Sequence, residues 1–282
     1  MNVVLPEKPK ILNRRNITYL TILVICIVAI AIAVYQFFSE EKLGVILGIT
    51  KEENEEITEL KQDFNSLFTN ELKIDQKSLK SDIKKLNEER DLVYTEYKKE
   101  RIEASNYNIN VSIPSINIDS TVVEEFNKNI KSTFLEPSEY ILQTESRNII
   151  YTVNYMARIE NDILSVAILS TFKENNNVQR TIVETYNYNL KTNKEVTLND
   201  FMQLKYLDTK ILESEIKKEI ENSQAQAEQL EELGYNIFSR NISDDMYKVE
   251  NAENYFIYNG YLYIIYAYGN NNNTGEMDIV II

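Results

Sequence analysis

The sequence predicts an α+β domain, an antiparallel sheet with packed helices, preceded by one transmembrane helix and a helical stalk. Three observations support this prediction. An uncharged apolar run lies near the start, a segment rich in Glu and Lys follows it, and the remainder alternates strand-like and helix-like patterns. The predicted parts are a cytoplasmic N-terminus (1–16), a transmembrane helix (17–38), a helical stalk (39–105) and an extracytoplasmic domain (106–282).

The apolar run over residues 17–38, ITYLTILVICIVAIAIAVYQFF, carries no charge. At about 1.5 Å per residue, a helix of this length spans a hydrocarbon core of roughly 30 Å. Tyr19 and Tyr35 lie near its ends, where aromatic belts occur. Lysines and arginines precede the run and two glutamates follow it closely, so the positive-inside rule places residues 1–16 in the cytoplasm. We therefore expect a single-pass protein of the cell membrane whose main domain is extracellular.

Two other interpretations of this run stay open. A signal peptidase could cleave it, because Ala29-Ile30-Ala31 and Ala31-Ile32-Ala33 fit the small-x-small rule. The apolar run continues past both sites, which favours a retained anchor. A lipid on Cys26 is disfavoured because the bulky Ile25 precedes it in the middle of the run.

The composition excludes several kinds of catalytic site. The chain has no His and one Cys, so it lacks a Ser-His-Asp triad, an HExxH zinc site, an internal disulfide and a thiolate metal cluster. We therefore predict no enzyme activity, no catalytic residues, no metal and no cofactor. The alternative is an enzyme that acts on cell-wall glycans through two carboxylates, with candidates such as Asp244, Asp245 and Asp278.

The charge balance bears on partners. Residues 1–16 carry a net charge of +3 and residues 17–38 carry none, so the total of −14 leaves −17 for residues 39–282. Such a surface repels nucleic acid and attracts cationic partners, and that attraction fades as salt rises. Keeping an exported domain soluble is the other explanation of the same charge.

The stalk is predicted from helical periodicity. Over residues 51–105 the chain has no Pro or Gly, and its apolar positions recur at helical spacing. The first stripe is Ile57, Leu60, Phe64, Leu67 and Phe68, and the second is Leu79, Ile83, Leu86, Val93 and Tyr97. A helical hairpin, a short coiled coil and a helix folded back onto the domain all fit. A structural component that pairs with another membrane protein through this stalk is a further functional alternative.

The outer domain starts with a strand and a helix. Residues 107–113 alternate apolar and polar side chains, which predicts a strand that Pro114 ends. Thr121 and Glu124 fit a capping box for a helix that Pro137 closes. The apolar face of that helix is Val122, Phe126, Ile130 and Phe134.

A strand meander and a long helix follow. Residues 149–155 alternate, ILSVAILSTF from Ile163 reads as the central strand, and ENNNVQ is the turn into TIVETYNYNL. KTNKEVTLNDF resembles a polar hairpin. A long helix runs from about Asp208 to a stop at Gly234. Its inward positions are Ile211, Leu212, Ile216 and Ile220.

The C-terminal segment predicts a second hairpin. Asn259-Gly260 is a strong turn signal, because both central residues of this turn take positive φ. The strand after it is apolar on both faces and so is predicted to be interior, and GNNNNTG leads into a last strand. Its many tyrosines suit core packing at a strand rim, with an exposed partner-binding stripe as the alternative.

Three stretches together resemble a known family: YNINVSIPSIN with the helix EEFNKNI, YNYNLKTNKEVTLNDF, and NYFIYNGYLYIIYAYGNNNNTGEMDIVI. They are similar to the extracytoplasmic domain shared by RsiV-type anti-sigma factors and PdaC-type peptidoglycan deacetylases of Gram-positive bacteria, over roughly residues 105–282. The family usually has Gly at the position of Asn193, and its last loop is longer and apolar, where this chain has NNNN. Gly275 matches the glycine that ends that loop.

The resemblance implies an α+β domain outside the cell that recognises a ligand. In RsiV-type proteins the domain binds lysozyme, a strongly cationic protein. This chain departs from both relatives, because residues 1–16 are too few for a sigma-binding domain and the deacetylase histidines are missing. We therefore expect an anchored sensor or binding module for a cationic protein or a cell-wall component. Regulation of a sigma factor is disfavoured by the short N-terminus.

Overall fold

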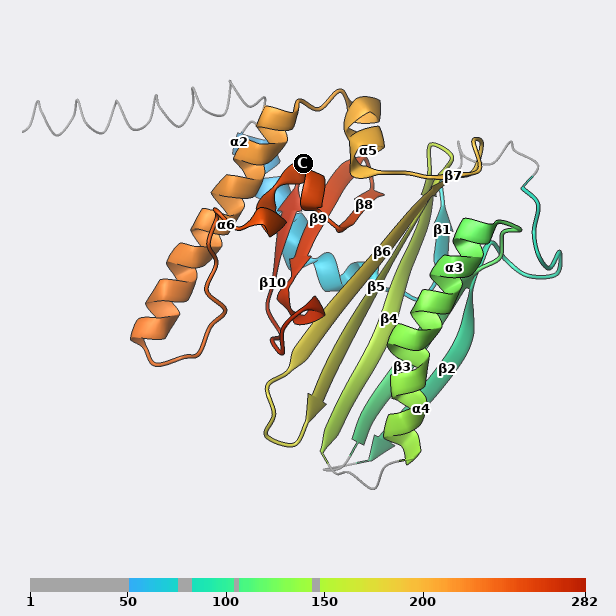
Figure 1. The fold of residues 1–282 in the computed structure, drawn as a ribbon, viewed down its shortest axis with the longest axis horizontal. Helices are drawn as coiled ribbons and strands as arrows, with labels where there is room; N and C mark the ends of the chain where they lie inside the picture. Colours follow the sequence, from blue (N-terminus) through green and yellow to red (C-terminus); the bar gives the residue numbers. More distant parts are fainter. Residues whose placement is uncertain (1–50, 76–82, 104–106, 144–147) are drawn as a thin grey trace, which may run out of the picture. The chain divides into compact units, whose positions relative to one another are not determined.

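The computed structural model describes residues 51–75, 83–103, 107–143 and 148–282 (Figure 1). Contacts divide the chain into two units, Met1–Glu56 and Ile57–Ile282. The predicted transmembrane segment 17–38 and the predicted N-terminus 1–16 lie outside the described residues. Within the described ranges, no helix has both the length and the apolar character needed to cross a bilayer.

The larger sheet is mostly antiparallel and has seven strands. Its order is β2-β3-β4-β5-β6-β7, and β1 pairs in parallel with β4. The strands are β1 (Leu72–Ile74), β2 (Val93–Glu103), β3 (Tyr107–Ile116), β4 (Ile149–Glu160), β5 (Ile163–Glu174), β6 (Arg180–Asn189) and β7 (Lys194–Glu195). The β3–β4 pair is also parallel, because a helical crossover joins these strands. The α+β class with an antiparallel sheet and packed helices is thus confirmed.

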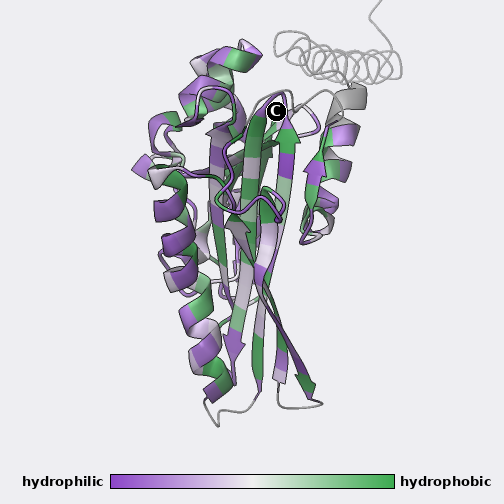
Figure 2. Cartoon of the chain, turned by 90° about the vertical axis from the view of Figure 1, so that its right-hand side faces the viewer, coloured by the Kyte–Doolittle hydropathy of each residue, from purple (hydrophilic) through white to green (hydrophobic). Residues whose placement is uncertain are grey.

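Helices cover one face of this sheet. The crossover consists of α3 (Thr121–Ile130), the π-turn η2 (Lys131–Leu135) and α4 (Glu136–Gln143). Its inward side chains Val123, Ile130, Phe134 and Ile141 are buried against alternate residues of β3 and β4. Figure 2 shows this division, with hydrophobic residues concentrated on the strands and hydrophilic ones on the outer side of the helices.

The other face packs against a second sheet. This sheet has the order β10-β9-β8, from β8 (Asn254–Tyr258), β9 (Tyr261–Ala267) and β10 (Met277–Ile281). Met156, Ala167 and Val183 of the large sheet meet Phe256 and Tyr263 of the small one. The short helix η1 (Phe64–Leu67) follows α2 (Lys51–Gln62) along the chain. Its residues Phe64 and Leu67, together with the next residue Phe68, pack in the same core between the two sheets.

The outer face of the small sheet is covered by α5 (Leu198–Lys205) and α6 (Thr209–Glu232). Leu212, Ile216 and Ile220 of α6 pack on Leu262 and Ile264 of β9. Both faces of β9 are therefore buried, and β9 lies between two strands, as predicted. The compact unit is a stack of four layers: helices, large sheet, small sheet, helices.

Several turn predictions are confirmed. Asn259 and Gly260 have φ of 53° and 84° between β8 and β9. Asp208 caps α6 through its side chain, and Gly234 follows the helix with φ of 89°. The Thr197 and Asp200 side chains form the reciprocal capping box of α5, which the sequence had suggested only as part of a hairpin.

The helical stalk predicted over 39–105 is wrong in its second half. Val93–Glu103 forms strand β2, and residues 83–103 contain no helix. Val93 and Tyr97 do lie inward, but on the alternating face of a strand that pairs with β3. Short apolar spacings of four residues fit both periods, and the tertiary pairing decided between them. The compact unit accordingly begins at Ile57 and not at residue 106.

Two prolines do not act as predicted. Pro114 lies within β3, opposite Thr95, where a bulge shifts the register of β2 and removes the need for its missing N–H. Pro137 lies inside an unbroken helical run over 121–143, directly after the π-turn, and the π-turn is the local irregularity that accompanies its missing N–H. The predicted capping box at Thr121 and Glu124 is also wrong: Ser120 is the N-cap and makes no side-chain cap bond.

Candidate functional site

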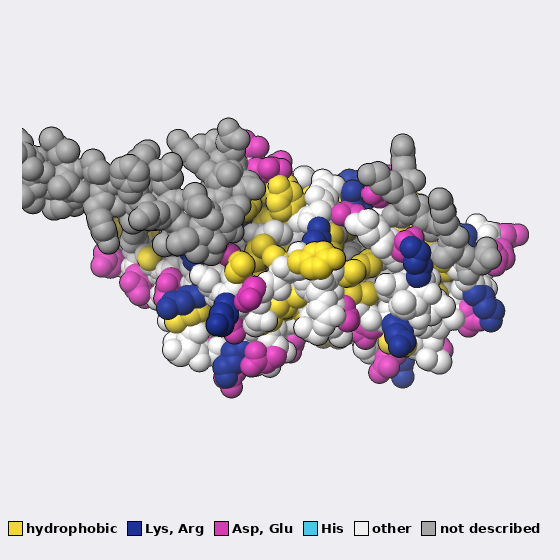
Figure 3. Space-filling model, turned by 90° about the horizontal axis from the view of Figure 1, so that it is seen from above, with side chains coloured by type: hydrophobic (Ala, Val, Ile, Leu, Met, Phe, Trp, Pro, Cys, Tyr) yellow, Lys and Arg dark blue, Asp and Glu magenta, His cyan; other side chains and the backbone are white. Residues whose placement is uncertain are grey.

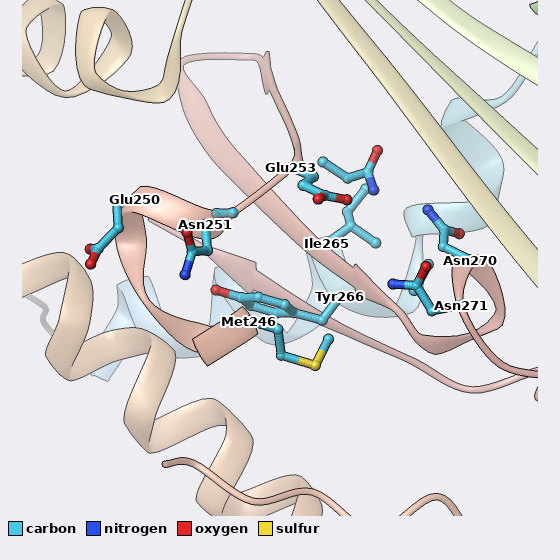
Figure 4. Close-up of a pocket in the computed structure, with 11 residues that line it drawn as sticks. Met246, Glu250, Asn251, Glu253, Ile265, Tyr266, Asn270 and Asn271 are labelled. Carbon is cyan, nitrogen blue, oxygen red and sulfur yellow. The ribbon is translucent and has the colours of Figure 1, made fainter. Parts of the chain in front are cut away.

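A polar pocket of about 400 Å³ opens at the start of the small sheet (Figure 4). Its walls are three short 3₁₀ turns: η3 (Asp245–Tyr247) and η4 (Val249–Asn251) on one side, and η5 (Tyr268–Asn270) on the other. Residues 265–267 of β9 form its floor. The volume falls in the range of small-molecule sites, which also suits a single side chain of a partner.

The η5 wall is fastened to the free edge of β6. The Asn270 side-chain amide donates to the Val183 carbonyl at 2.7 Å and accepts from the Val183 N–H at 3.0 Å, as a neighbouring strand would. Gly269 passes so close to β6 that an added Cβ would lie 1.8 Å from the Thr181 carbonyl oxygen. Asn270 therefore covers an exposed sheet edge and at the same time positions one side of the pocket.

The two walls are tied together by a buried polar network. The Tyr247 hydroxyl of η3 lies 2.9 Å from the Tyr268 hydroxyl of η5. Tyr268 in turn donates to the Asp278 carboxylate on β10. Arg240 binds the same carboxylate through two nitrogens, at 2.7 and 3.1 Å, and also contacts Glu276 at 3.1 Å. The Arg240 and Asp278 side chains are 7% and 5% exposed, so the charge-assisted bonds are shielded from water.

Carboxylates stand on the η4 side. Glu250 and Glu253 line the pocket and are exposed, and neither forms an ion pair with any described residue. Burial raises the pKa of the Glu184 carboxyl on β6, and the Glu253 carboxylate raises that pKa further. A cation bound beside Glu253 would relieve this repulsion between like charges.

The pocket also holds hydrogen-bonding groups that the fold does not use. Tyr266 is 4% exposed, and its hydroxyl has no hydrogen-bond partner among the described residues. In Figure 4 this hydroxyl points towards Asn251. Asn254 and Asn271 line the same space, and neither side-chain amide bonds to a described residue. An unpaired buried hydroxyl costs about 1–3 kcal/mol, which a ligand could offset.

The carboxylates suggested by the sequence have different surroundings. Asp278 is buried and held by Arg240 and Tyr268, whereas Asp245 is exposed and pairs with Lys248 at 2.6 Å. Asp244 is exposed and accepts from Asn241 at 3.0 Å. Each thus has a structural contact of its own. Within the described part of the chain, no group of three or more His, Cys, Asp or Glu side chains could hold a metal ion.

The pocket residues were missed at the sequence level. Asn270 and Asn271 belong to a low-complexity Asn run, and Glu250 and Glu253 are two of 44 acidic residues. No local pattern distinguishes them from a solvated surface, because only the docking of η5 on β6 brings them opposite each other. The prediction that the C-terminal tyrosines pack in the core is confirmed for Tyr263, Tyr266 and Tyr268, which are buried.

Comparisons with known proteins find only distant structural similarity. No protein-family model matches the chain, and no curated protein matches it. A DUF3298 family protein from Pseudomonas aeruginosa is similar with a TM-score of 0.26 and 10% identity, over 39% of this chain and 54% of that one. A member of the DUF3298 family from Bacteroides fragilis is similar with a TM-score of 0.30 and 13% identity, over 57% and 74%. The chain thus matches little more than half the length of the Pseudomonas protein, and no family is assigned on these likenesses.

Proposed function

We propose that this chain is a membrane-anchored extracytoplasmic binding module whose 246–271 pocket receives a cationic group of its partner. The observation that carries the proposal is the two exposed carboxylates that line the pocket, Glu250 and Glu253, neither of which forms an ion pair with a described residue. The pKa of Lys248 is raised mainly by its hydrogen bond to Asp245 and only last by the Glu250 carboxylate, so Lys248 is held by Asp245. The surrounding charge supports it, since residues 57–282 carry a net −13. A lysine or arginine side chain carries several N–H donors, and the carboxylates and Asn side chains that line the pocket can accept hydrogen bonds from them.

The resemblance to the RsiV-type and PdaC-type domain supports the same proposal. The three stretches that resemble the RsiV and PdaC domain correspond to β3 with α3, to β6 through α5, and to β8 through β10. The third stretch includes Asn254 and residues 265–271 of the pocket. A strongly cationic protein such as lysozyme is therefore the first partner to test. The amides also suit the hydroxyl groups of a cell-wall glycan, which the same experiment can distinguish.

The test measures binding of the full chain, in a mild detergent, to lysozyme and to soluble wall fragments at rising salt. The pocket variant is Glu250→Gln with Glu253→Gln. The control is Glu231→Gln with Glu232→Gln, which removes the same charge from the exposed end of α6. We expect salt-sensitive binding to lysozyme that the pocket variant weakens about three- to tenfold, as two partly desolvated ion pairs would.

The outcomes separate the function from the site. If no cationic protein binds even at low salt, the proposed function is wrong. If both variants weaken binding equally, net charge alone attracts the partner and the pocket is not the site. Binding to wall fragments that salt leaves unchanged would assign the pocket to a glycan.

A further inference from the structure

Tyr206 is a bulky residue at the left-handed C-cap of α5, and the fold explains neither this choice of residue nor its exposure. It follows the last turn of α5 with φ of 53°, in the left-handed region where Gly or Asn is usual. Its side chain is 96% exposed, so its ring packs against almost nothing. A bulky residue in this region is strained, and such strain concentrates where a side chain has a role in binding.

The neighbours of Tyr206 hold it outward. Met202 is buried, and its carbonyl accepts the Leu207 N–H at 2.9 Å, while Leu207 packs against the core. The turn is thus fixed on both sides, and a glycine would make it at lower conformational cost. Leu204, two residues earlier, is 56% exposed. The two side chains form an apolar projection, which we name the α5 tip.

The charge around the α5 tip differs from that of the rest of the domain. Residues 191–210 contain four lysines and three acidic residues, a net +1, within a unit that carries −13. Lys191 pairs with Asp162 at 2.5 Å, and Glu195 and Asp200 lie beside Leu204 and Tyr206, so the surface around the α5 tip is close to neutral. Lys194 and Lys210 are exposed. Figure 3 views this end of the molecule from above, and hydrophobic side chains gather in the middle of that face among lysines and acidic groups.

The geometry points to docking of the α5 tip on a lipid bilayer, with Tyr206 and Leu204 at the headgroup level and the lysines near lipid phosphates. Tyrosine is favoured at this depth, and lysine extends its ammonium to the interface. The inference rests on the proposed anchoring through residues 17–38. The 18 residues between that segment and Ile57 can span at most about 60 Å, so the compact unit stays near the membrane.

The absence of tryptophan allows a clean test. The variant Tyr206→Trp places the only tryptophan at the α5 tip, and Tyr235→Trp, at a site that is 62% exposed beyond α6, is the matched control. Both full-length variants are reconstituted in vesicles whose acyl chains carry bromine, a quencher of tryptophan. We expect Trp emission from position 206 to shift to the blue and to lose most of its intensity, and emission from position 235 to match that in unbrominated lipid.

Flotation of the vesicles separates the two proposals. If the chain does not float with the lipid, the anchor is wrong and docking falls with it. If it floats but position 206 is unquenched, or both positions are quenched alike, docking is overturned while the anchor stands. The variant Leu204→Trp repeats the test in case Tyr206→Trp perturbs the turn, with circular dichroism as the check on folding.

Discussion

The two halves of the compact unit are stabilised in different ways. The large sheet with α3 and α4 is packed through apolar side chains that alternate along β3, β4 and β5. The small sheet meets a segment without α-helix or strand, residues 235–253, whose internal backbone hydrogen bonds are confined to the short turns over residues 241–252. There the buried Arg240, Asp278, Tyr268 and Tyr247 provide the connections. Regular strands satisfy their own polar groups, whereas an irregular segment needs side chains for this purpose.

The pocket lies in the second half for the same physical reason. A segment without regular structure leaves amide and carboxylate side chains free to face solvent, and the buried network holds the segment in one position. Substitutions confined to one half of the compact unit test whether apolar packing stabilises the first half and the polar network the second.

The largest effect is expected from Arg240→Leu. It leaves the Asp278 carboxylate buried without its cation, and loss of one partner of a buried pair costs about 3–5 kcal/mol. Arg101→Leu, which breaks the exposed pair with Glu103 on β2, should cost less than about 1 kcal/mol. Urea unfolding measures both. Equal losses in the two variants would show that the network does not stabilise the second half.

Two Tyr→Phe changes, one in β9 and one in η5, should affect stability differently. Tyr268→Phe removes a hydrogen bond to a buried carboxylate and should cost about 1.5–3 kcal/mol. Tyr263→Phe removes a buried hydroxyl that has no partner among the described residues, so it should leave stability unchanged or raise it. Thermal unfolding of both variants measures the difference. A loss in both would mean that the Tyr263 hydroxyl has a partner, such as a buried water.

Asn270→Ala tests the fastening of η5 to β6. The variant loses two hydrogen bonds to the Val183 backbone, and we expect a loss of about 1–3 kcal/mol together with weaker binding at the pocket. Asn272→Ala, on an exposed neighbour in the same Asn run, is the control and should be neutral. Amide exchange at Val183 should increase only in Asn270→Ala. Unchanged exchange would argue against the strand-like contact.

The smallest effect concerns alkaline pH. Burial raises the pKa of Tyr263 to about 12, whereas an unfolded tyrosine titrates near 10. The folded state therefore keeps the Tyr263 hydroxyl proton up to a higher pH than the unfolded state does. The contribution of this group to the free energy of unfolding is complete below about pH 10 and is lost as the pH rises towards 12. Tyr263→Phe should reduce the loss of stability between pH 9 and 11 in urea titrations. An identical loss in wild type and variant would exclude Tyr263 as a contributor.

The sequence was informative where one residue pattern has one structural solution. Alternation over 149–155, the run from Ile163 and the Asn259-Gly260 turn each correspond to the predicted strand or hairpin. The predicted helix over Leu79–Tyr97 was wrong over the described residues 83–97, which contain no helix. From Val93 onward the chain forms a strand, because β3 offered a pairing edge to residues whose apolar spacing fitted either period. Pro114 was misread as a strand end for a related reason, since the bulge that accommodates it lies in another strand.

The sequence by itself determined the acidic charge, the absence of imidazole chemistry, the order of most strands and helices along the chain, and the burial of the C-terminal tyrosines. Only the tertiary structure decided that β2 belongs to the sheet, that Arg240 finds Asp278, and that Asn270 lies against Val183. Periodicity reports which face of an element is apolar, and it depends on near neighbours in the chain. A polar contact between residues that are 38 or 87 positions apart depends on how the layers stack, and no local pattern encodes that.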